Sequence, residues 1–304
     1  MLEPSLIEIA QWINAHSTVL TVAVAALALA AEALPRMRAG GTSSLARRDW
    51  RASWFTNSGL LLCAFGLSWA ITPLLSPWFS SALSGEHGLL AQVEMPFALR
   101  VVLGVFLLDF IGYAAHWLFH RVPWLWQLHQ VHHSDTAMNA STHFRQHPLQ
   151  LLVLALLQLP LLYLLGIPAV SWLLLMPIAL VLQTWQHAAL PGAQASMPML
   201  AWLLVTPALH RLHHHPERQW HDHNYGNVFS LWDRVFGTLV PPAACTSATA
   251  VGVVGLTDWP ASQSRGFWRT LAMPFLRPTA RTARTGGLPA RPKSRHLSKQ
   301  DRPS

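Results

Sequence analysis

The chain has 304 residues, of which only 11% are charged and 52% are hydrophobic, and its formal net charge is +8. Soluble domains carry about 25% charged residues, so this composition excludes an ordinary water-soluble protein and indicates one embedded in lipid. The basic balance does not indicate nucleic acid binding, because DNA- and RNA-binding proteins spread Lys and Arg over a solvated face, and this chain has little solvated face.

Five apolar segments follow one another along the chain, and each is a candidate membrane helix. A helix needs roughly 20 apolar residues to cross a bilayer. The last two segments have 17 residues each and are joined by Gly166-Ile167-Pro168, so they form either a thin spanning hairpin or one that dips in and returns. The segments are 19–34, 58–83, 97–118, 149–165 and 169–185.

The connection between the first two segments sets the expected orientation. It carries five arginines against one acid, and by the positive-inside rule such a loop is cytoplasmic. The third and fifth segments then end on this same side. We therefore expect an integral membrane protein, in the inner membrane if the source is bacterial, whose histidine-rich segments and C-terminal tail face the cytoplasm. The charged residues of the loop are Arg36, Arg38, Arg47, Arg48, Arg51 and Asp49.

Histidines are concentrated in one part of the chain, since fourteen of the 17 lie within residues 116–223. One pair has i, i+4 spacing, and the pattern His-x2-His-His occurs twice. Residues so spaced share one face of a helix, where two imidazoles can bind one metal ion. A further histidine ends the fifth apolar segment. The candidate metal ligands are His116, His120, His129, His132, His133, His187, His210, His213 and His214.

The number of candidate ligands bears on the metal site. A tetrahedral zinc needs four ligands, and a catalytic zinc needs three plus water. Two ions with four or five imidazoles each would use all nine histidines. Because imidazole suits iron, zinc and copper, the ligand type leaves the element open.

Two acidic residues near the histidines invite specific expectations. Asp109 lies two helical turns before His116 inside an apolar segment, where an ionisable residue usually has a function. We expect its carboxylate to accept a hydrogen bond from a ligand imidazole; pairing with Arg100 or another polar neighbour is the alternative. For Arg145 we expect a salt bridge to Asp135.

With these motifs in order, residues 107–239 resemble the fatty acid hydroxylase and sterol desaturase superfamily of membrane di-iron enzymes. The resemblance includes the three histidine boxes, the hydrophobic hairpin and the single histidine that ends it, and the closing Asn224-Tyr225-Gly226 and Trp232-Asp233-Arg234 segments. Asp109-x2-Gly112-Tyr113-x2-His116 and Thr206-Pro207-x2-His210-Arg211 are most similar to the alkylglycerol monooxygenase-like bacterial members.

The resemblance implies a fold, an activity and cofactors. The fold is an all-α integral membrane protein with four to five hydrophobic helices and a cytoplasmic histidine-rich helical cap that holds a dinuclear site. The activity is O2-dependent hydroxylation of an unactivated C–H bond of a lipid: a fatty acyl chain, an alkyl-ether lipid, a sterol or a related isoprenoid. Two iron ions and O2 take part, and an external donor, either a redox protein or a reduced pterin, supplies electrons.

Other functions compete with hydroxylation. Desaturation by the same site is equally compatible with the residues. A zinc-dependent hydrolase or a metal-binding protein without redox chemistry is disfavoured, because the chain lacks a His-Glu-x2-His motif. A scaffold with purely structural histidines is the least favoured.

Three regions are expected along the chain. Residues 1–95 form a membrane hairpin and loop, residues 96–242 form the catalytic domain, and residues 243–304 form a disordered basic cytoplasmic tail. From residue 261 onward the chain holds ten Lys and Arg against Asp301 alone, with little apolar content. The positive charge thus lies where anionic lipid headgroups would attract it.

Overall fold

The computed structural model describes residues 8, 12, 15–38, 44–83, 87–190, 197–244, 253–259 and 264–277. This part of the chain is helical, and its only β-type pairs are two isolated bridges, Leu204–Phe229 and Leu256–Trp259. Five helices are long and apolar enough to cross a membrane. The prediction of an all-α integral membrane protein is confirmed. The five are α2 (Ser17–Arg38), α3 (Ser44–Leu83), α4 (Phe97–Arg121), α6 (Pro148–Leu165) and α7 (Ala169–His187).

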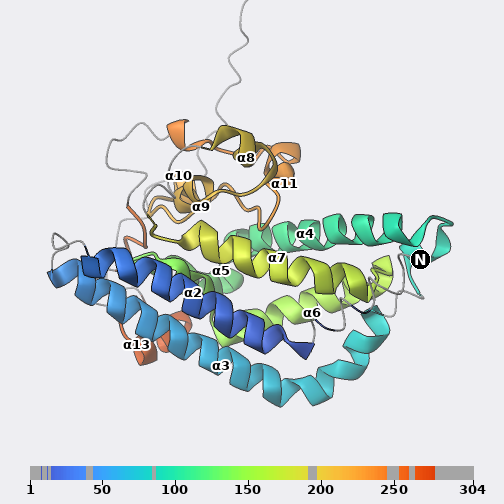
Figure 1. Ribbon diagram of the computed structural model, residues 1–304, viewed down its shortest axis with the longest axis horizontal. Coiled ribbons are helices and arrows are strands. Elements are labelled where there is room, and N and C mark those ends of the chain that lie inside the picture. The colour runs from blue at the N-terminus through green and yellow to red at the C-terminus, as the bar shows by residue number, and fades with distance from the viewer. Residues whose placement is uncertain are drawn as a thin grey trace, which may run out of the picture.

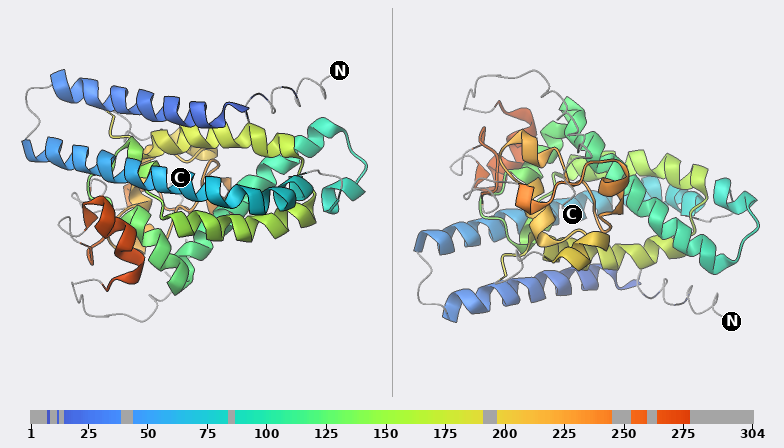
Figure 2. Two further views of the ribbon diagram at one scale, coloured as in Figure 1. Left: turned by 90° about the horizontal axis from the view of Figure 1, so that it is seen from below. Right: turned by 90° about the horizontal axis from the view of Figure 1, so that it is seen from above.

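The long helices form a bundle in which α2 and α4 pack against α7 while α3 packs against α6 (Figure 2). The shorter helices α8 to α11 gather beside this bundle (Figure 1). They connect through irregular segments, so the bundle carries a small helical cap. The short elements are α5 (Pro123–His133), α8 (Pro198–Leu203), α9 (Pro207–His213), α10 (Arg218–His221), α11 (Leu231–Val235), α13 (Phe267–Ala272), η1 (Leu89–Gln92), η2 (Ala140–Phe144), η3 (Pro242–Ala244) and η4 (Met273–Phe275).

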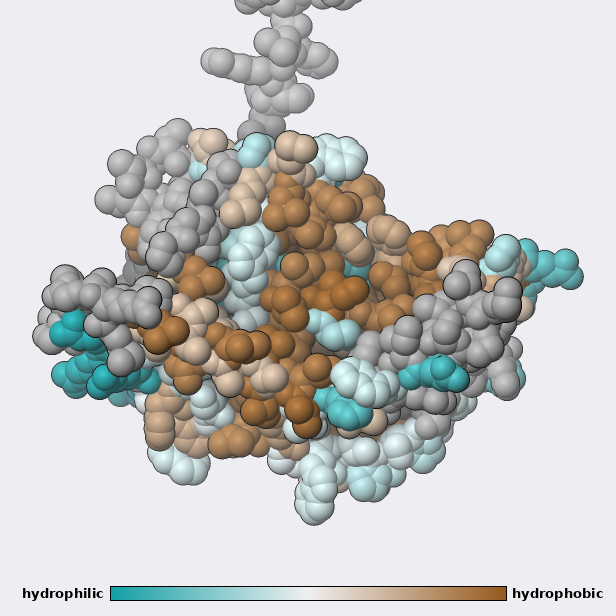
Figure 3. Space-filling view, viewed as in Figure 1, coloured by the Kyte–Doolittle hydropathy of each residue, from teal (hydrophilic) through white to brown (hydrophobic). Residues whose placement is uncertain are grey.

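The outer surface of the bundle is apolar, as a lipid environment requires. Large hydrophobic side chains are exposed along its helices, for example Leu62 and Trp69 on α3, Val102 on α4 and Leu164 on α6. Figure 3 shows such residues covering much of one face of the molecule. Without lipid this surface would be in water, so it supports insertion in a bilayer.

Helix α3 is longer than the predicted segment 58–83, because it begins at Ser44 and includes the charged residues 47–51. Much of the expected loop is therefore helix. No Gly or Pro interrupts its first turns, and Ser53 and Asn57 in this added part are buried against the segment that follows α5. The polar half of α3 thus packs on the protein rather than crossing lipid.

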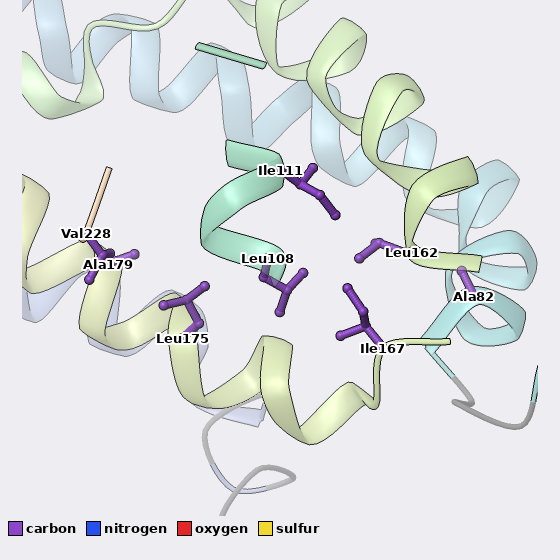
Figure 4. Close-up of a cluster of buried hydrophobic side chains, with 8 residues drawn as sticks. All are labelled: Ala82, Leu108, Ile111, Leu162, Ile167, Leu175, Ala179 and Val228. Atoms are coloured by element: carbon purple, nitrogen blue, oxygen red, sulfur yellow. The ribbon is translucent and has the colours of Figure 1, made fainter. Parts of the chain in front are cut away.

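The hairpin of α6 and α7 is closed by Gly166, which ends α6 in the left-handed conformation with φ of 65°. A side chain there would also collide with the carbonyl oxygen of His87. Just beyond the turn, apolar side chains from α3, α4, α6 and α7 pack together (Figure 4). This packing fixes α4 and α7 relative to one another, and both helices carry a histidine in the last turn.

Two described segments of the predicted tail are folded. Trp259 and Met273 are buried with Leu60 of α3 and Val131 of α5, and the indole of Trp259 donates to Gln130 Oε1 (2.9 Å). The prediction of disorder is wrong for residues 253–259 and 264–277, whose few apolar side chains fill this cluster. Residues 243–244 are also described, and the rest of the predicted tail lies outside the described ranges.

Candidate metal centre

A first group of five histidines comes from three helices. His116 and His120 are on α4, His129 and His133 on α5, and His213 on α9, and one ring nitrogen of each lies within 4.8 Å of the others. The Nε2 atom of His129 is 3.1 Å from that of His116 and 3.3 Å from that of His133. The i, i+4 pairs meet because such residues stack on one helical face.

A second group contains the other four candidate ligands: His132 on α5, His187 at the end of α7, and His210 and His214 around α9. Its Nε2 atoms form a chain, with distances of 3.2 Å from His132 to His187, 2.9 Å from His187 to His210 and 3.2 Å from His210 to His214. The nine histidines therefore divide into five and four.

The His-x2-His-His pattern explains why the two groups adjoin. In α5, residues 129 and 133 share a face and serve the first group, while His132 projects about 100° from its neighbour His133 and serves the second. Around α9, His213 and His214 divide in the same way. The rings of His133 and His214 stack with centroids 4.5 Å apart, so the groups lie side by side.

The geometry of both groups fits metal ions. Two nitrogens that bind one ion at about 2.1 Å and at right angles are about 3 Å apart, close to the separations given above. The Nε2 atoms of His120 and His213 are buried and have no hydrogen-bond partner. Burial first, and neighbouring histidines second, hold the pKa of His133 and His214 well below the ordinary value. The imidazoles are thus neutral and have lone pairs to donate.

Hydrogen bonds on the opposite ring nitrogen orient several of these imidazoles. Nδ1 donates to the carbonyl oxygen of Tyr225 from His116 (2.8 Å) and to that of Gln183 from His187 (2.6 Å). His213 donates to the carbonyl of His223 (2.7 Å). A proton on Nδ1 leaves the lone pair on Nε2, where a metal would bind.

Two glutamines link the two histidine groups, a role that the sequence did not predict. Gln150 Oε1 lies 3.3 Å from His129 Nδ1, its amide nitrogen donates to Gln146 Oε1, and Gln146 Nε2 lies 3.3 Å from His132 Nδ1. One signal was visible, since Gln150 is a polar residue inside an apolar helix.

Asp109 does not contact an imidazole. Its carboxylate accepts hydrogen bonds from the backbone N–H groups of Val228 (3.1 Å) and Phe229 (3.2 Å) and from the indole of Trp232 (3.0 Å). The expected bond to a ligand histidine is therefore wrong. The side chain instead ties α4 to the loop between the third histidine box and α11, which fits the structural alternative.

Arg145 and Asp135 belong to one buried network without forming a direct salt bridge. Asn57 lies between them, since its Oδ1 accepts from Arg145 (3.0 Å) and its Nδ2 donates to Asp135 (3.1 Å). Burial raises the pKa of Asp135, but Arg145 and the hydrogen bonds from Ser53 and Asn57 hold it below the ordinary value. The predicted direct salt bridge is therefore wrong, because polar side chains of α3 lie between the guanidinium and the carboxylate.

Comparison with known proteins identifies the part of the chain that carries these groups. Residues 101–238 match the family model for fatty acid hydroxylases. These residues form a fatty acid hydroxylase domain. Its limits fall within the predicted catalytic region, 96–242, and the expected superfamily is confirmed.

Curated relatives of this hydroxylase domain act on lipids, as their names state. Ornithine lipid hydroxylase OlsE of Rhizobium tropici is 32% identical over 185 residues, which is 60% of this chain and 53% of that protein. Alkylglycerol monooxygenase of Homo sapiens is 35% identical over 130 residues, which is 43% of this chain and 28% of that protein. The chain therefore aligns with about half or less of these relatives. No solved structure matches it significantly.

The remaining histidines near the two groups stay outside them. His143 is close to the second group, with its ring centroid 6.1 Å from that of His187. His221 donates from Nδ1 to the backbone oxygen of His215 (2.9 Å). Asp222 lies 3.4 Å from Nδ1 of His120 and forms, with His120 and His221, a third cluster of possible ligands.

A cavity of about 700 Å³ connects the histidines of the hydroxylase domain with the apolar helices. His116, His129, His132, His187 and His210 line one part of it. The rest is lined mainly by apolar residues of the membrane helices, together with a few amides such as Gln158 and Gln186. Among the described lining residues there is no Lys or Arg, and Asp109 is the one acid. The other lining residues include Leu20 of α2, Phe65 of α3, Leu154 of α6 and Met176 of α7.

Proposed function

We propose that the chain is an O2-dependent non-haem di-iron monooxygenase that hydroxylates an unactivated C–H bond of a lipid. The observation that carries this proposal is the pair of adjoining histidine groups at one part of an apolar cavity. The family match and the lipid-modifying relatives support the substrate class. Candidate lipids are fatty acyl chains, alkyl-ether lipids, sterols and related isoprenoids.

Iron is the proposed metal in both groups. His116, His120, His129, His133 and His213 would hold one ion, and His132, His187, His210 and His214 the other. Two bound irons would supply the O2-dependent oxidation, with electrons from a redox protein or a reduced pterin. Hydrolysis with zinc is not favoured, because Asp109, the one acid among the described cavity residues, already accepts three hydrogen bonds.

The protein's own residues prepare the site for this chemistry. Backbone carbonyls fix the rings of His116, His187 and His213, and the amide oxygen of Gln150 faces Nδ1 of His129. The apolar walls exclude water around the reacting carbon. Because the cavity is lined by all five membrane helices, a lipid chain would enter it from the bilayer.

We also propose that the histidine groups face the cytoplasm. Arg47, Arg48 and Arg51 lie near the start of α3. The same part of α3 bonds to the segment after the second histidine box, through Ser53 and Asp135 (2.7 Å). The basic residues and the histidines are therefore at one end of the bundle, and the positive-inside rule favours the cytoplasm for that end.

The proposal is tested with the full chain purified in nanodiscs. We expect close to two irons per chain, and O2 consumption with a lipid and a reductant. Product analysis separates hydroxylation, which adds one oxygen atom, from desaturation, which removes two hydrogen atoms. Full turnover by zinc-loaded protein without O2 would replace the proposal with the hydrolase.

A further inference from the structure

Two amide side chains form a polar pair on the cavity wall. Gln186 on α7 donates from Nε2 to the backbone oxygen of Asn227 (2.8 Å), and both residues line the cavity. This bond fixes which end of the Gln186 amide is oxygen. Gln186 is only 1% exposed, and its Oε1 has no hydrogen-bond partner. A buried acceptor without a partner is unfavourable, so this oxygen is suited to a donor on a ligand.

The side chain of Asn227 supplies the complementary group. It makes no hydrogen bond with the described residues, and its Nδ2 lies over Gly112 of α4. A Cβ at position 112 would collide with this nitrogen, so the glycine gives the amide its place. Gly112 is one helical turn before His116, and Gln186 directly precedes His187. The polar pair therefore lies beside a ligand of each histidine group.

The surroundings define which ligand chemistry suits this pair. Gln146 and Gln150 use their amides on each other and on His129 and His132. Gln186 Oε1 and the Asn227 amide are not used in this way. No Lys or Arg stands among the described cavity residues, so a phosphate or carboxylate has no counter-charge there.

We propose that Gln186 and Asn227 form a subsite for an uncharged donor–acceptor group of the lipid substrate, either a hydroxyl or a secondary amide. Gln186 Oε1 accepts its hydrogen, and Asn227 Nδ2 donates to its oxygen. The carbon beside this group is then held next to the histidines, while a charged headgroup stays outside the cavity. This inference rests on the proposed function, because it specifies the substrate of that same site.

The test compares lipids in which the donor hydrogens are either present or replaced by methyl groups. Binding of 1-O-hexadecylglycerol and its 2,3-di-O-methyl ether to the full chain in nanodiscs is measured by scintillation proximity with labelled lipid. N-hexadecylacetamide and its N-methyl derivative form the second pair. In at least one pair, we expect the wild type to bind the donor lipid about tenfold more tightly than the methylated one, a difference of about 1.4 kcal/mol.

Variants connect this preference to the subsite. In Q186M, which keeps the chain length but lacks the amide, the preference should fall close to one. N227V should act in the same direction and serves if Q186M does not fold. Q158M is the matched control, because Gln158 lines the cavity from α6 and forms no hydrogen bond with the pair among the described residues. This variant should retain the preference.

Each outcome is decisive. A preference in the hydroxyl pair identifies a lipid alcohol, and one in the amide pair identifies an acyl amide. Equal binding within both pairs, or a preference that Q186M and N227V leave intact, overturns the proposal. The measurement needs no turnover, so a retained preference in protein that consumes no O2 contradicts the oxygenase function and leaves the subsite standing.

Discussion

The Nε2 atoms of His187 and His210 lie 2.9 Å apart, although one residue ends α7 and the other belongs to α9. Two neutral imidazoles can share a proton only if one nitrogen carries it. His187 already donates from Nδ1 to the carbonyl of Gln183, so its Nε2 presents a lone pair. A metal ion bound by both Nε2 atoms would stabilise this short separation. The same reasoning applies to the short separations between Nε2 atoms in the other histidine group.

The first prediction concerns metal content. Replacing His187 by Ala removes one of four ligands from the second group and leaves the first group intact. We expect iron to fall from about two ions per chain to about one, with at least a hundredfold loss of activity. Elemental analysis of the purified protein measures the ratio.

His143→Ala is the matched control for that substitution. His143 is also close to the second group, but it is not one of the four histidines whose ring nitrogens converge. The variant should keep two irons. Equal iron losses in both variants would contradict the assignment of ligands.

The second prediction concerns metal-free protein at low pH. Burial, and then neighbouring histidines, lower the pKa of His133, His210 and His214 well below 6.5. The unfolded chain therefore binds more protons than the folded chain once the pH falls below about 6.5, and the free energy of unfolding decreases as the pH falls further. Each such histidine contributes up to about 1.4 kcal/mol per pH unit.

Thermal unfolding in detergent with a chelator checks this dependence. The midpoint should fall steadily between about pH 7 and pH 5, and a variant in which His133 and His214 are both replaced by Gln should show a weaker slope. A midpoint that does not change over this range would show that the buried imidazoles are not neutral in the folded protein.

The sequence predicted which histidines converge better than it predicted the residues that support them. The His-x2-His-His spacing was sufficient because i, i+3 and i+4 positions are set by local helix geometry. The role of Asp109 was wrong because its partners, Val228 and Phe229, lie on a loop more than a hundred positions away. The folded segment around Trp259 was missed for a similar reason: a few apolar residues in a polar stretch find their partners only in three dimensions.

The third prediction follows from the corrected role of Asp109. In Asp109→Asn, an N–H2 group replaces one of the two oxygens that accept hydrogen bonds from Val228, Phe229 and Trp232. At least one buried donor then loses its acceptor. We expect the free energy of unfolding to fall by about 1–3 kcal/mol, which chemical denaturation of the detergent-solubilised protein can measure.

Glu217→Gln is a suitable comparison for Asp109→Asn. Glu217 accepts a hydrogen bond from the side chain of Gln219 in an exposed position. Its replacement should change the free energy of unfolding by less than about 0.5 kcal/mol. If the two variants are equally stable, the carboxylate of Asp109 is not what holds the loop against α4.

The fourth prediction concerns the C-terminal segments, which lie beyond the matched hydroxylase domain. They hold the second histidine box from outside: Trp259 donates to Gln130, the backbone oxygen of Ser264 accepts from Arg145 (2.6 Å), and that of Leu271 accepts from His147 (3.0 Å). Ending the chain after Ala244 removes all three contacts and exposes Val131 between His129 and His132. We expect this truncation to lose iron from both groups and to unfold at lower temperature.

Ending the chain after Arg277 instead keeps every described contact of these segments, so this longer truncation product should retain two irons and the wild-type unfolding temperature. Trp259→Phe removes the indole hydrogen bond and also reduces the volume of the ring that packs with Leu60 and Met273. The two losses together should lower the free energy of unfolding by about 2–4 kcal/mol. Iron content unaffected by ending the chain after Ala244 would mean that α5 holds its histidines in place without the C-terminal segments, and the three contacts would then be peripheral to the metal centre.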